Sequence, residues 1–238
     1  MILPARAKSG LVFNEGRKMS VETSVLARSK LFAGLGSDTA NRLLKLADII
    51  RFEPRDFIVR EGQRADSFFC VLQGYVRLFK TNEMGRAADI RIGEPRDTFA
   101  ECLIGGGGIY PYNVQAADNA MLARFTIDGV RRLAEEDRAL DRNIMQLMAD
   151  HLLATMECVA SDRLQTASQR VANYLLSQCA AGKPSETVRL PYQKSLLAGK
   201  LGLVPEALSR AFGALKEAGV TVKGRTVRID DIAALRQM

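Results

Sequence analysis

The sequence predicts an α+β protein in which a β-barrel or jelly roll is followed by one long helix and a basic winged helix-turn-helix. Three observations support this prediction. Short strand-like segments with glycine turns fill residues 56–127, apolar residues recur at heptad spacing over residues 145–159, and the last third carries all the excess positive charge. The 238 residues are enough for one large domain or two ordinary ones.

The N-terminal part begins without a steady period, and we expect residues 1–24 to form a mobile arm. A helix should follow within "SKLFAGLGSDTANRLLKLADIIRF", with Ser37 or Asp38 as the N-cap, because a short polar side chain there accepts a backbone hydrogen bond. The apolar residues of this helix recur at helical spacing: Leu43, Leu44, Leu46 and Ala47.

The stretch "DFIVREGQRADSFFCVLQGYVRLFKTNEMGRAADIRIG" is rich in β-branched and aromatic residues, as strands are. Many short strands joined by glycine turns indicate an antiparallel barrel or jelly roll, to which we assign residues 25–130. The run Gly105–Gly108 separates two strands, and it could either close backbone N–H groups around a phosphate or be a plain loop. Three dipeptides mark turns at fairly even spacing: Glu61-Gly62, Gln73-Gly74 and Met84-Gly85.

The pattern becomes helical again from Asp128, which is the expected cap of a short first helix. A long second helix should run from about Ala139 to Asp162. A helix with a narrow apolar stripe needs a partner, so we expect residues 131–162 to form a homodimer; the alternative is that the stripe packs on the protein's own barrel. The seam residues follow a 3-4-3-4 spacing: Met145, Met148, Leu152, Thr155 and Val159.

The last part of the chain, residues 163–238, is its basic part. It holds 12 Lys and Arg against 5 Asp and Glu, a net charge of +7, which leaves 22 basic and 22 acidic residues in the rest. Such asymmetry favours a domain that meets a polyanion, the alternative being a basic domain that is merely soluble. The part opens with "TASQRVANYLLSQCAAG", an amphipathic helix that we expect to end at Gly182 and Pro184.

The segment "LPYQKSLLAGKLGLVPEALSRAFGALKEAGVTVKGRTVRI" predicts a winged helix-turn-helix. Its first helix should cover about Tyr192–Leu201, Gly202 permits the turn, and Pro205 fits the first turn of the second helix. The wing is a hairpin with Lys223-Gly224 at its tip. One face of the second helix should be buried, through Leu208, Phe212 and Leu215.

The opposite face of that helix carries side chains suited to reading base edges. Arg210 can donate two hydrogen bonds to guanine, Glu206 can accept from cytosine, and Ser209 can bond a base edge or a phosphate. The alternative for Glu206 and Arg210 is an ordinary surface ion pair between neighbouring turns. Three basic residues are placed to touch phosphates: Lys194, Lys223 and Arg225.

The chain offers little for catalysis. His151 is the single histidine, which excludes a site built on several histidines, and neither a GxGxxG motif nor a P-loop is present, so we expect no enzyme.

No apolar run approaches the roughly 18 residues of a membrane span, and the first residues lack the apolar core of a signal peptide, so we expect a cytoplasmic protein. The cysteines form no CxxC pair and are expected to be small buried residues: Cys70, Cys102, Cys158 and Cys179.

The order of these elements resembles the CRP/FNR family of bacterial transcription regulators over roughly residues 25–236. "REGQRADSFFCVLQGYVRL" looks like the family's barrel signature, and "DTFAE" looks like the start of its effector cassette. "PEALSR" is similar to the recognition-helix motif of the FNR branch, with Glu206, Ser209 and Arg210 at the base-reading positions. The resemblance implies a cyclic-nucleotide-binding-like β-roll and a homodimer that binds double-stranded DNA at an inverted TTGAT half-site and recruits or blocks RNA polymerase.

The resemblance leaves the small-molecule effector open. Members that bind cyclic AMP hold its phosphate with a glutamate and an Arg-Ser pair; Glu101 matches the glutamate, but Pro111 and Tyr112 stand near the pair. No Lys or Arg occurs between Arg96 and Arg124, which argues against cyclic AMP because a buried phosphate would lack its charge partner. The resemblance suggests four effector-pocket candidates: Glu101, Tyr110, Tyr112 and Thr155.

Two further kinds of sensor occur in relatives. Residues 1–69 contain no cysteine, so the N-terminal iron–sulfur centre of the oxygen-sensing members is not supported. "DTFAECLI" is similar in shape to the nitric-oxide-responsive regulators of denitrification, some of which bind haem, and His151 would be the axial ligand. The alternative is that His151 is a polar residue of the helix. Cysteine redox control also stays open, although no cysteine stands in an evidently basic site, which argues against it.

Overall fold

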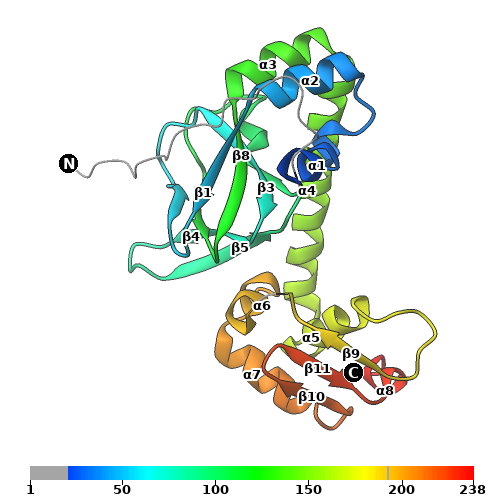
Figure 1. The fold of residues 1–238 in the computed structure, drawn as a ribbon. Helices are drawn as coiled ribbons and strands as arrows, with labels where there is room; N and C mark the ends of the chain where they lie inside the picture. Colours follow the sequence, from blue (N-terminus) through cyan, green and yellow to red (C-terminus); the bar gives the residue numbers. More distant parts are fainter. Residues whose placement is uncertain (1–20, 192) are drawn as a thin grey trace. The chain divides into compact units, whose positions relative to one another are not determined.

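The computed structural model describes residues 21–191 and 193–238 (Figure 1). Most of the predicted N-terminal arm therefore lies outside the described residues. Residues 21–24 are not part of an arm, because they belong to the first helix, α1 (Val21–Ala27). No helix in the described ranges is both long and apolar enough to cross a membrane.

The described chain forms two compact units. The first contains the strands of the N-terminal half and the first half of the longest helix, and the second contains the remainder of that helix and the C-terminal elements. The first unit extends to Ala87 and again over Ile92–Leu152, and the second comprises Ala88–Arg91 and Leu153–Met238.

The first unit is largely a β-roll of two four-stranded sheets, with strand orders β1-β8-β3-β6 and β2-β7-β4-β5; only Ala88–Arg91, the middle of β5, group with the second unit. The strand pairs β1-β8, β2-β7, β3-β6, β3-β8 and β4-β7 are all antiparallel, so the predicted antiparallel jelly roll is confirmed. Its strands are β1 (Ala47–Phe52), β2 (Phe57–Val59), β3 (Ser67–Gln73), β4 (Val76–Thr81), β5 (Ala87–Gly93), β6 (Thr98–Phe99), β7 (Asn113–Ala116) and β8 (Ala120–Thr126).

Aromatic pairs from neighbouring strands pack on both faces of the β1-β8-β3-β6 sheet, because Phe68 and Phe69 are consecutive residues of β3 and their side chains point to opposite faces. The rings of Phe68 and Phe125 stack with centroids 5.1 Å apart, and those of Phe69 and Phe99 with centroids 5.0 Å apart. All four side chains are buried, so each pair adds the contact of two ring faces to the hydrophobic stabilisation of the core. The predicted turns at Gly62, Gly74 and Gly85 are confirmed, since all three glycines have positive φ angles.

Gly74 is the tightest of these turns. Its φ is +76°, and a Cβ atom built there would lie 2.4 Å from the carbonyl oxygen of Asn119. A side chain is thus excluded by both the backbone conformation and the neighbouring strand end. The amide N–H of Tyr75 donates to the Asp118 carboxylate at 2.8 Å, which fixes the same corner of the roll.

Helices close the β-roll at the N-terminal side and at the exit from β8. The helices α2 and α3 lie together at one end of the roll, joined by an ion pair of 2.5 Å between Arg42 and Glu136 (Figure 1). Besides α1, these short elements are η1 (Lys30–Phe32), α2 (Ser37–Lys45), η2 (Glu101–Leu103) and α3 (Ile127–Glu136).

Two predicted helix caps were wrong. The N-cap of α2 is Gly36, not Ser37 or Asp38, and the N-cap of α3 is Thr126, not Asp128. In both cases the preceding residue holds the extended conformation of a cap without a side-chain hydrogen bond, so the polar residue stands inside the first turn. There an acidic side chain still favours the positive end of the helix dipole. Ala47, which was expected to belong to the helix, begins β1 instead.

The longest helix is α4 (Arg138–Leu164), close to the predicted range. Its 27 residues span about 40 Å. The Asp137 carboxylate accepts a hydrogen bond of 2.8 Å from the Ala139 N–H and thereby satisfies one of the free donors at the start of the helix. In its first half, one face is buried against the β-roll through Leu140, Ile144 and Leu147.

After the end of α4, the described part of the second unit contains a three-stranded antiparallel sheet of order β10-β11-β9 and the helices α5 to α8. The helix α5 opens with the capping box of Thr166 and Gln169. It ends earlier than predicted. The backbone N–H groups of Gln178 and Cys179 donate to carbonyls three residues earlier in the chain, and this tightens the last turn before Gly182 is reached. These elements are α5 (Ala167–Ser177), β9 (Glu186–Arg189), α6 (Lys194–Lys200), α7 (Pro205–Ala214), β10 (Val220–Lys223), β11 (Thr226–Ile229) and α8 (Ile232–Leu235).

Candidate DNA interface and effector site

The helices α6 and α7 form the predicted helix-turn-helix. The helix α6 begins at Lys194, and Tyr192, where its start was predicted, lies outside the described residues. Gly202 makes the turn with a φ of +62°, and a Cβ atom there would lie 2.9 Å from an Asp162 carboxylate oxygen. Pro205 occupies the first turn of α7, where its missing N–H costs no hydrogen bond.

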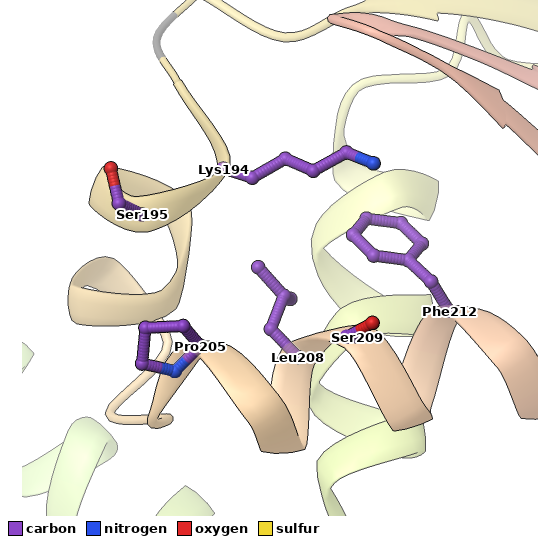
Figure 2. A pocket seen from close by; sticks show the side chains of 6 residues that line it. All are labelled: Lys194, Ser195, Pro205, Leu208, Ser209 and Phe212. Atoms are coloured by element: carbon purple, nitrogen blue, oxygen red, sulfur yellow. The ribbon is translucent and has the colours of Figure 1, made fainter.

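The inner face of α7 is apolar, as predicted. Leu208, Phe212 and Leu215 are all buried. A hollow of about 140 Å³ remains beside it, lined by Lys194, Ser195, Pro205, Leu208, Ser209 and Phe212. Figure 2 shows Leu208 pointing into this hollow and Lys194 extending towards the ring of Phe212, whose centroid lies 5.6 Å from Nζ, within reach of a cation–π interaction.

The outer face of α7 is open to solvent. Glu206, Ser209 and Arg210 are exposed, and across the part of the chain that the structure describes their side chains make no hydrogen bond or ion pair. The alternative expected from the sequence, an ion pair between Glu206 and Arg210, is therefore not formed. Gly213 continues this face with open space where a side chain would be. The polar groups of this face are thus available to an external partner.

The wing is the hairpin of β10 and β11, with Lys223 and Gly224 at its tip. Lys223 is exposed at the turn, where it could reach a phosphate. Arg225 is held differently: its Nε donates to the Leu190 carbonyl at 2.9 Å, and its Nη2 donates to the Pro191 carbonyl. Its guanidinium therefore anchors the wing to the segment before α6, a role that its place in the sequence did not reveal.

Arg170 is a second structural arginine that sequence reasoning missed. It projects from α5, and its Nη1 donates to the Asp162 carboxylate near the end of α4. The same nitrogen donates to the carbonyl of Leu201 at 2.8 Å, directly before the turn at Gly202. One side chain thus joins the end of the long helix to the turn between α6 and α7. The contacts are 8 and 31 residues apart in sequence, so no local pattern predicts them.

The predicted effector cassette forms a tight loop in the first unit. It enters through Ala100, whose φ of +64° is a left-handed conformation uncommon for a residue with a side chain. The 3-10 helix η2 follows and leads to the four glycines, of which Gly106 and Gly107 have φ angles of +150° and +126°. Residues with a side chain rarely adopt these angles, so the loop requires glycine at these two positions.

The two tyrosines of the cassette are tied to the backbone. The Tyr110 hydroxyl is buried and donates to the Ser67 carbonyl at 2.8 Å, and this burial raises the pKa of Tyr110. The Tyr112 hydroxyl accepts a hydrogen bond of 3.0 Å from the N–H of Ala100. Both hydroxyls therefore stabilise the loop, and their predicted contact with an effector stays a prediction.

A positively charged side chain contacts this loop, although the sequence has no Lys or Arg between Arg96 and Arg124. The Arg131 side chain, on α3, donates through Nε to the Ile104 carbonyl at 3.0 Å and through Nη1 to Asp128 at 3.0 Å. The absence of Lys and Arg between Arg96 and Arg124 therefore does not leave the loop without a positive charge nearby. The sequence argument considered only residues adjacent in the chain and so did not include Arg131, and the expectation that cyclic AMP is not bound stays a prediction.

Glu101 is the most buried acidic side chain of the cassette, with 4% of the residue exposed. Its Oε1 lies 2.5 Å from Nδ1 of His151, which projects from α4. The two predicted candidates, one for the effector pocket and one for haem, are thus brought together by the fold across 50 residues of sequence. Thr155, the fourth effector candidate, is an exposed residue of α4 in the second unit.

Comparison with known proteins agrees with both units. Residues 49–137 match the family described as cyclic nucleotide-binding domain, and residues 169–238 match the Crp-like helix-turn-helix domain. The crystal structure of a candidate cyclic nucleotide binding protein from Ruegeria pomeroyi is 30% identical, with a TM-score of 0.61, over 91% of this chain and 96% of that chain. The chain belongs to the CRP/FNR family of transcription regulators.

Other relatives of this CRP/FNR regulator support the same assignment. The nitrogen fixation regulation protein FixK of Bradyrhizobium diazoefficiens is 27% identical over 71% of this chain and 72% of its own length. The crystal structure of DNR from Pseudomonas aeruginosa is 26% identical, with a TM-score of 0.51, over 95% of this chain and 99% of that chain. The family consists of DNA-binding transcription regulators rather than enzymes, and the predicted fold class is confirmed.

The long helix of this CRP/FNR regulator carries a row of exposed apolar side chains. Of the predicted seam, Met145, Leu152 and Val159 are 53%, 61% and 46% exposed. Met148 differs, because it is half-buried and packs against the core of the β-roll. Leu153 and Met156, which the seam omitted, are 63% and 60% exposed. We call Met145, Leu152, Leu153, Met156 and Val159 the α4 stripe.

The cysteines of this CRP/FNR regulator are less uniform than predicted. Cys70 is buried as expected, and that burial raises its pKa to about 12. Cys102 is exposed, so the prediction was wrong there, because the residue lies on the outer side of η2 beside the buried Glu101. Cys158 and Cys179 are half-buried.

The haem prediction depends on His151 and on the possible metal ligands around it. No group of three or more His, Cys, Asp or Glu suited to a metal ion occurs among the residues that the structure describes. An axial haem ligand needs only one histidine, but Nδ1 of His151 is already engaged by Glu101. Haem binding therefore stays a prediction, and it would require Nε2 of this histidine.

Proposed function

We propose that the protein is a homodimeric transcription regulator that reads a TTGAT-type palindrome through the outer face of α7. The observation that carries this proposal is the solvent exposure of Glu206, Ser209 and Arg210. The three side chains share one exposed face, while the opposite face of the same helix is anchored in the core. A rigid helix with unsatisfied polar groups on one side is suited to the major groove of DNA.

The proposed roles follow from the chemistry of each side chain. Arg210 donates two hydrogen bonds to guanine O6 and N7, and Glu206 accepts from the N4 amino group of cytosine. Ser209 bonds a base edge or a phosphate. Lys194 and Lys223 contact phosphates and fix the register, while Arg225 contributes mainly by holding the wing in place. The resemblance to the FNR branch supports TTGAT as the half-site.

A palindrome requires a two-fold symmetric protein, and the α4 stripe supports one. It exposes five large apolar residues along one helix, more than scattered surface residues account for. Two copies of α4 packed against each other would bury these residues in a coiled-coil seam. The resulting homodimer would present two α7 helices to successive half-sites and recruit or block RNA polymerase at the adjoining promoter.

A mobility-shift titration with a TTGAT palindrome and a scrambled duplex of equal length tests this proposal. Arg210→Ala should weaken binding to the palindrome by about 1–3 kcal/mol and relax specificity at one base pair per half-site. Lys216→Ala is the matched control, since this exposed lysine follows α7 and its loss removes one equal charge. Equal binding to both duplexes by wild type, Arg210→Ala and Lys216→Ala would refute the proposal.

A cyclic nucleotide as the effector is the second candidate, and one observation favours it. Arg131 places a guanidinium at the loop after Glu101, where a phosphate could replace its contact with Ile104. Calorimetry with cyclic AMP and cyclic GMP, on wild type and on Arg131→Gln, tests this candidate. Absence of heat and of a thermal shift at millimolar ligand would exclude it.

A further inference from the structure

The contact between Glu101 and His151 joins two parts of the chain with different tasks. Glu101 begins η2 in the predicted effector cassette, whose residues 100–112 we call the effector loop, and its side chain is 5% exposed. Moving a carboxylate out of water is costly unless a charged or hydrogen-bonding partner compensates for the lost hydration. His151 supplies such a partner from α4, with Nδ1 at 2.5 Å from Oε1. The position of the loop therefore depends on a residue of the dimerisation helix.

Besides Tyr110, the side chains of Tyr112, Arg131 and His151 hold the effector loop in place. Tyr112 accepts the hydrogen bond from the N–H of Ala100, and Arg131 donates to the carbonyl of Ile104. Both of these residues belong to the β-roll or to α3. The third, His151, belongs to α4 and stands next to Leu152 of the α4 stripe. A displacement of the loop would act on α4 through this third contact, at the place where the helix exposes its apolar row.

We propose that the pair of His151 and Glu101 is an internal latch, which positions the effector loop on α4 and keeps the α4 stripe in the register that dimerisation requires. Both side chains of the latch belong to this chain. His151 is a positioning residue in this scheme, because it acts on DNA binding through the loop and the helix. The proposal rests on the proposed function insofar as DNA binding is its readout, but the latch itself is also measurable at the loop.

The test uses the full chain and compares variants at position 151. His151→Leu removes the donor at similar size, so the buried carboxylate loses this hydrogen bond and the loop should be held less firmly. His151→Asn places an amide nitrogen near the position of Nδ1 and should restore the bond. Glu101→Gln, which removes the charge but keeps an acceptor, should behave like His151→Asn. Arg142→Gln on an exposed side of α4 is the matched control.

Two measurements report on each variant: the dimer dissociation constant from sedimentation equilibrium, and the dissociation constant for the TTGAT palindrome. His151→Leu should raise both by about tenfold or more, while His151→Asn, Glu101→Gln and Arg142→Gln stay within about threefold of wild type. A His151→Leu variant equal to wild type in both constants would overturn the latch. So would a His151→Asn variant as weak as His151→Leu, since the bond rather than the ring shape is proposed to act.

Amide hydrogen exchange in η2 separates the two proposals. If wild type does not distinguish the palindrome from a scrambled duplex, the proposed function fails, and the latch is then judged by dimerisation and exchange alone. Faster exchange over residues 101–104 in His151→Leu, with wild-type rates in His151→Asn, supports the latch in either case. Unchanged exchange in His151→Leu contradicts it, because Glu101 would then be held in place by other groups.

Discussion

Replacement of Leu152 by alanine should weaken the homodimer strongly. The substitution removes three carbon atoms, which are worth about 2.4 kcal/mol when fully buried. Because Leu152 is 61% exposed in the single chain, about 1.5 kcal/mol of this is available to a partner helix. In a two-fold symmetric dimer the change occurs twice, so the loss is about 3 kcal/mol, or about a hundredfold in the dimer dissociation constant.

Sedimentation equilibrium over a range of protein concentrations measures this constant directly. Met84→Ala is the matched control, since Met84 is 88% exposed in the turn between β4 and β5 and does not belong to the α4 stripe. Its removal should leave the dimer dissociation constant unchanged. If both variants dimerise like wild type, or if Met84→Ala is as weak as Leu152→Ala, the α4 stripe is not the dimer interface.

Two further predictions concern local structure. Since burial raises the pKa of Cys70 to about 12, its thiol stays protonated and should resist iodoacetamide in the folded protein at pH 8, whereas Cys102 is exposed and should be alkylated first; mass spectrometry that finds Cys70 labelled early would contradict this. The raised pKa also means that this burial stabilises the fold fully at neutral pH and loses its contribution as the pH rises from 9 towards 12. Arg225→Ala should speed amide exchange in β10 and β11, because two hydrogen bonds to the preceding segment are lost, while Lys223→Ala should not; equal protection in both variants would count against the anchoring role.

The elements with strong periodicity could be predicted from the sequence, and their ends could not. Over α4 the apolar residues repeat for many turns, so the predicted range of Ala139 to Asp162 differs little from the observed helix. The caps of α2 and α3 were misplaced because the extended residue before each helix uses no side chain, which leaves no sequence signal. At the end of α5, bonds of the backbone alone stop the helix before the expected glycine.

In the site, residues on one helix face could be predicted from the sequence, whereas contacts between distant parts of the chain could not. The residues of α7 that we propose to read bases share one helix face, so spacing alone placed Glu206 and Arg210 together on an exposed surface. The contact of Glu101 with His151 joins residues 50 apart, and Arg131 reaches the effector loop from another helix. Such contacts are set by tertiary packing. Met156 could have been found, since it is an apolar residue one turn after Leu152, but the chosen seam passed through Thr155 instead.

The α4 stripe has a consequence for how such a regulator would respond in a cell. In the proposed homodimer, the DNA-binding species forms from two chains, so at low expression its amount rises with the square of the chain concentration. A small change in synthesis or degradation would then produce a larger change in promoter occupancy. The exposed row of apolar side chains would in this way make the abundance of the protein an input signal in its own right.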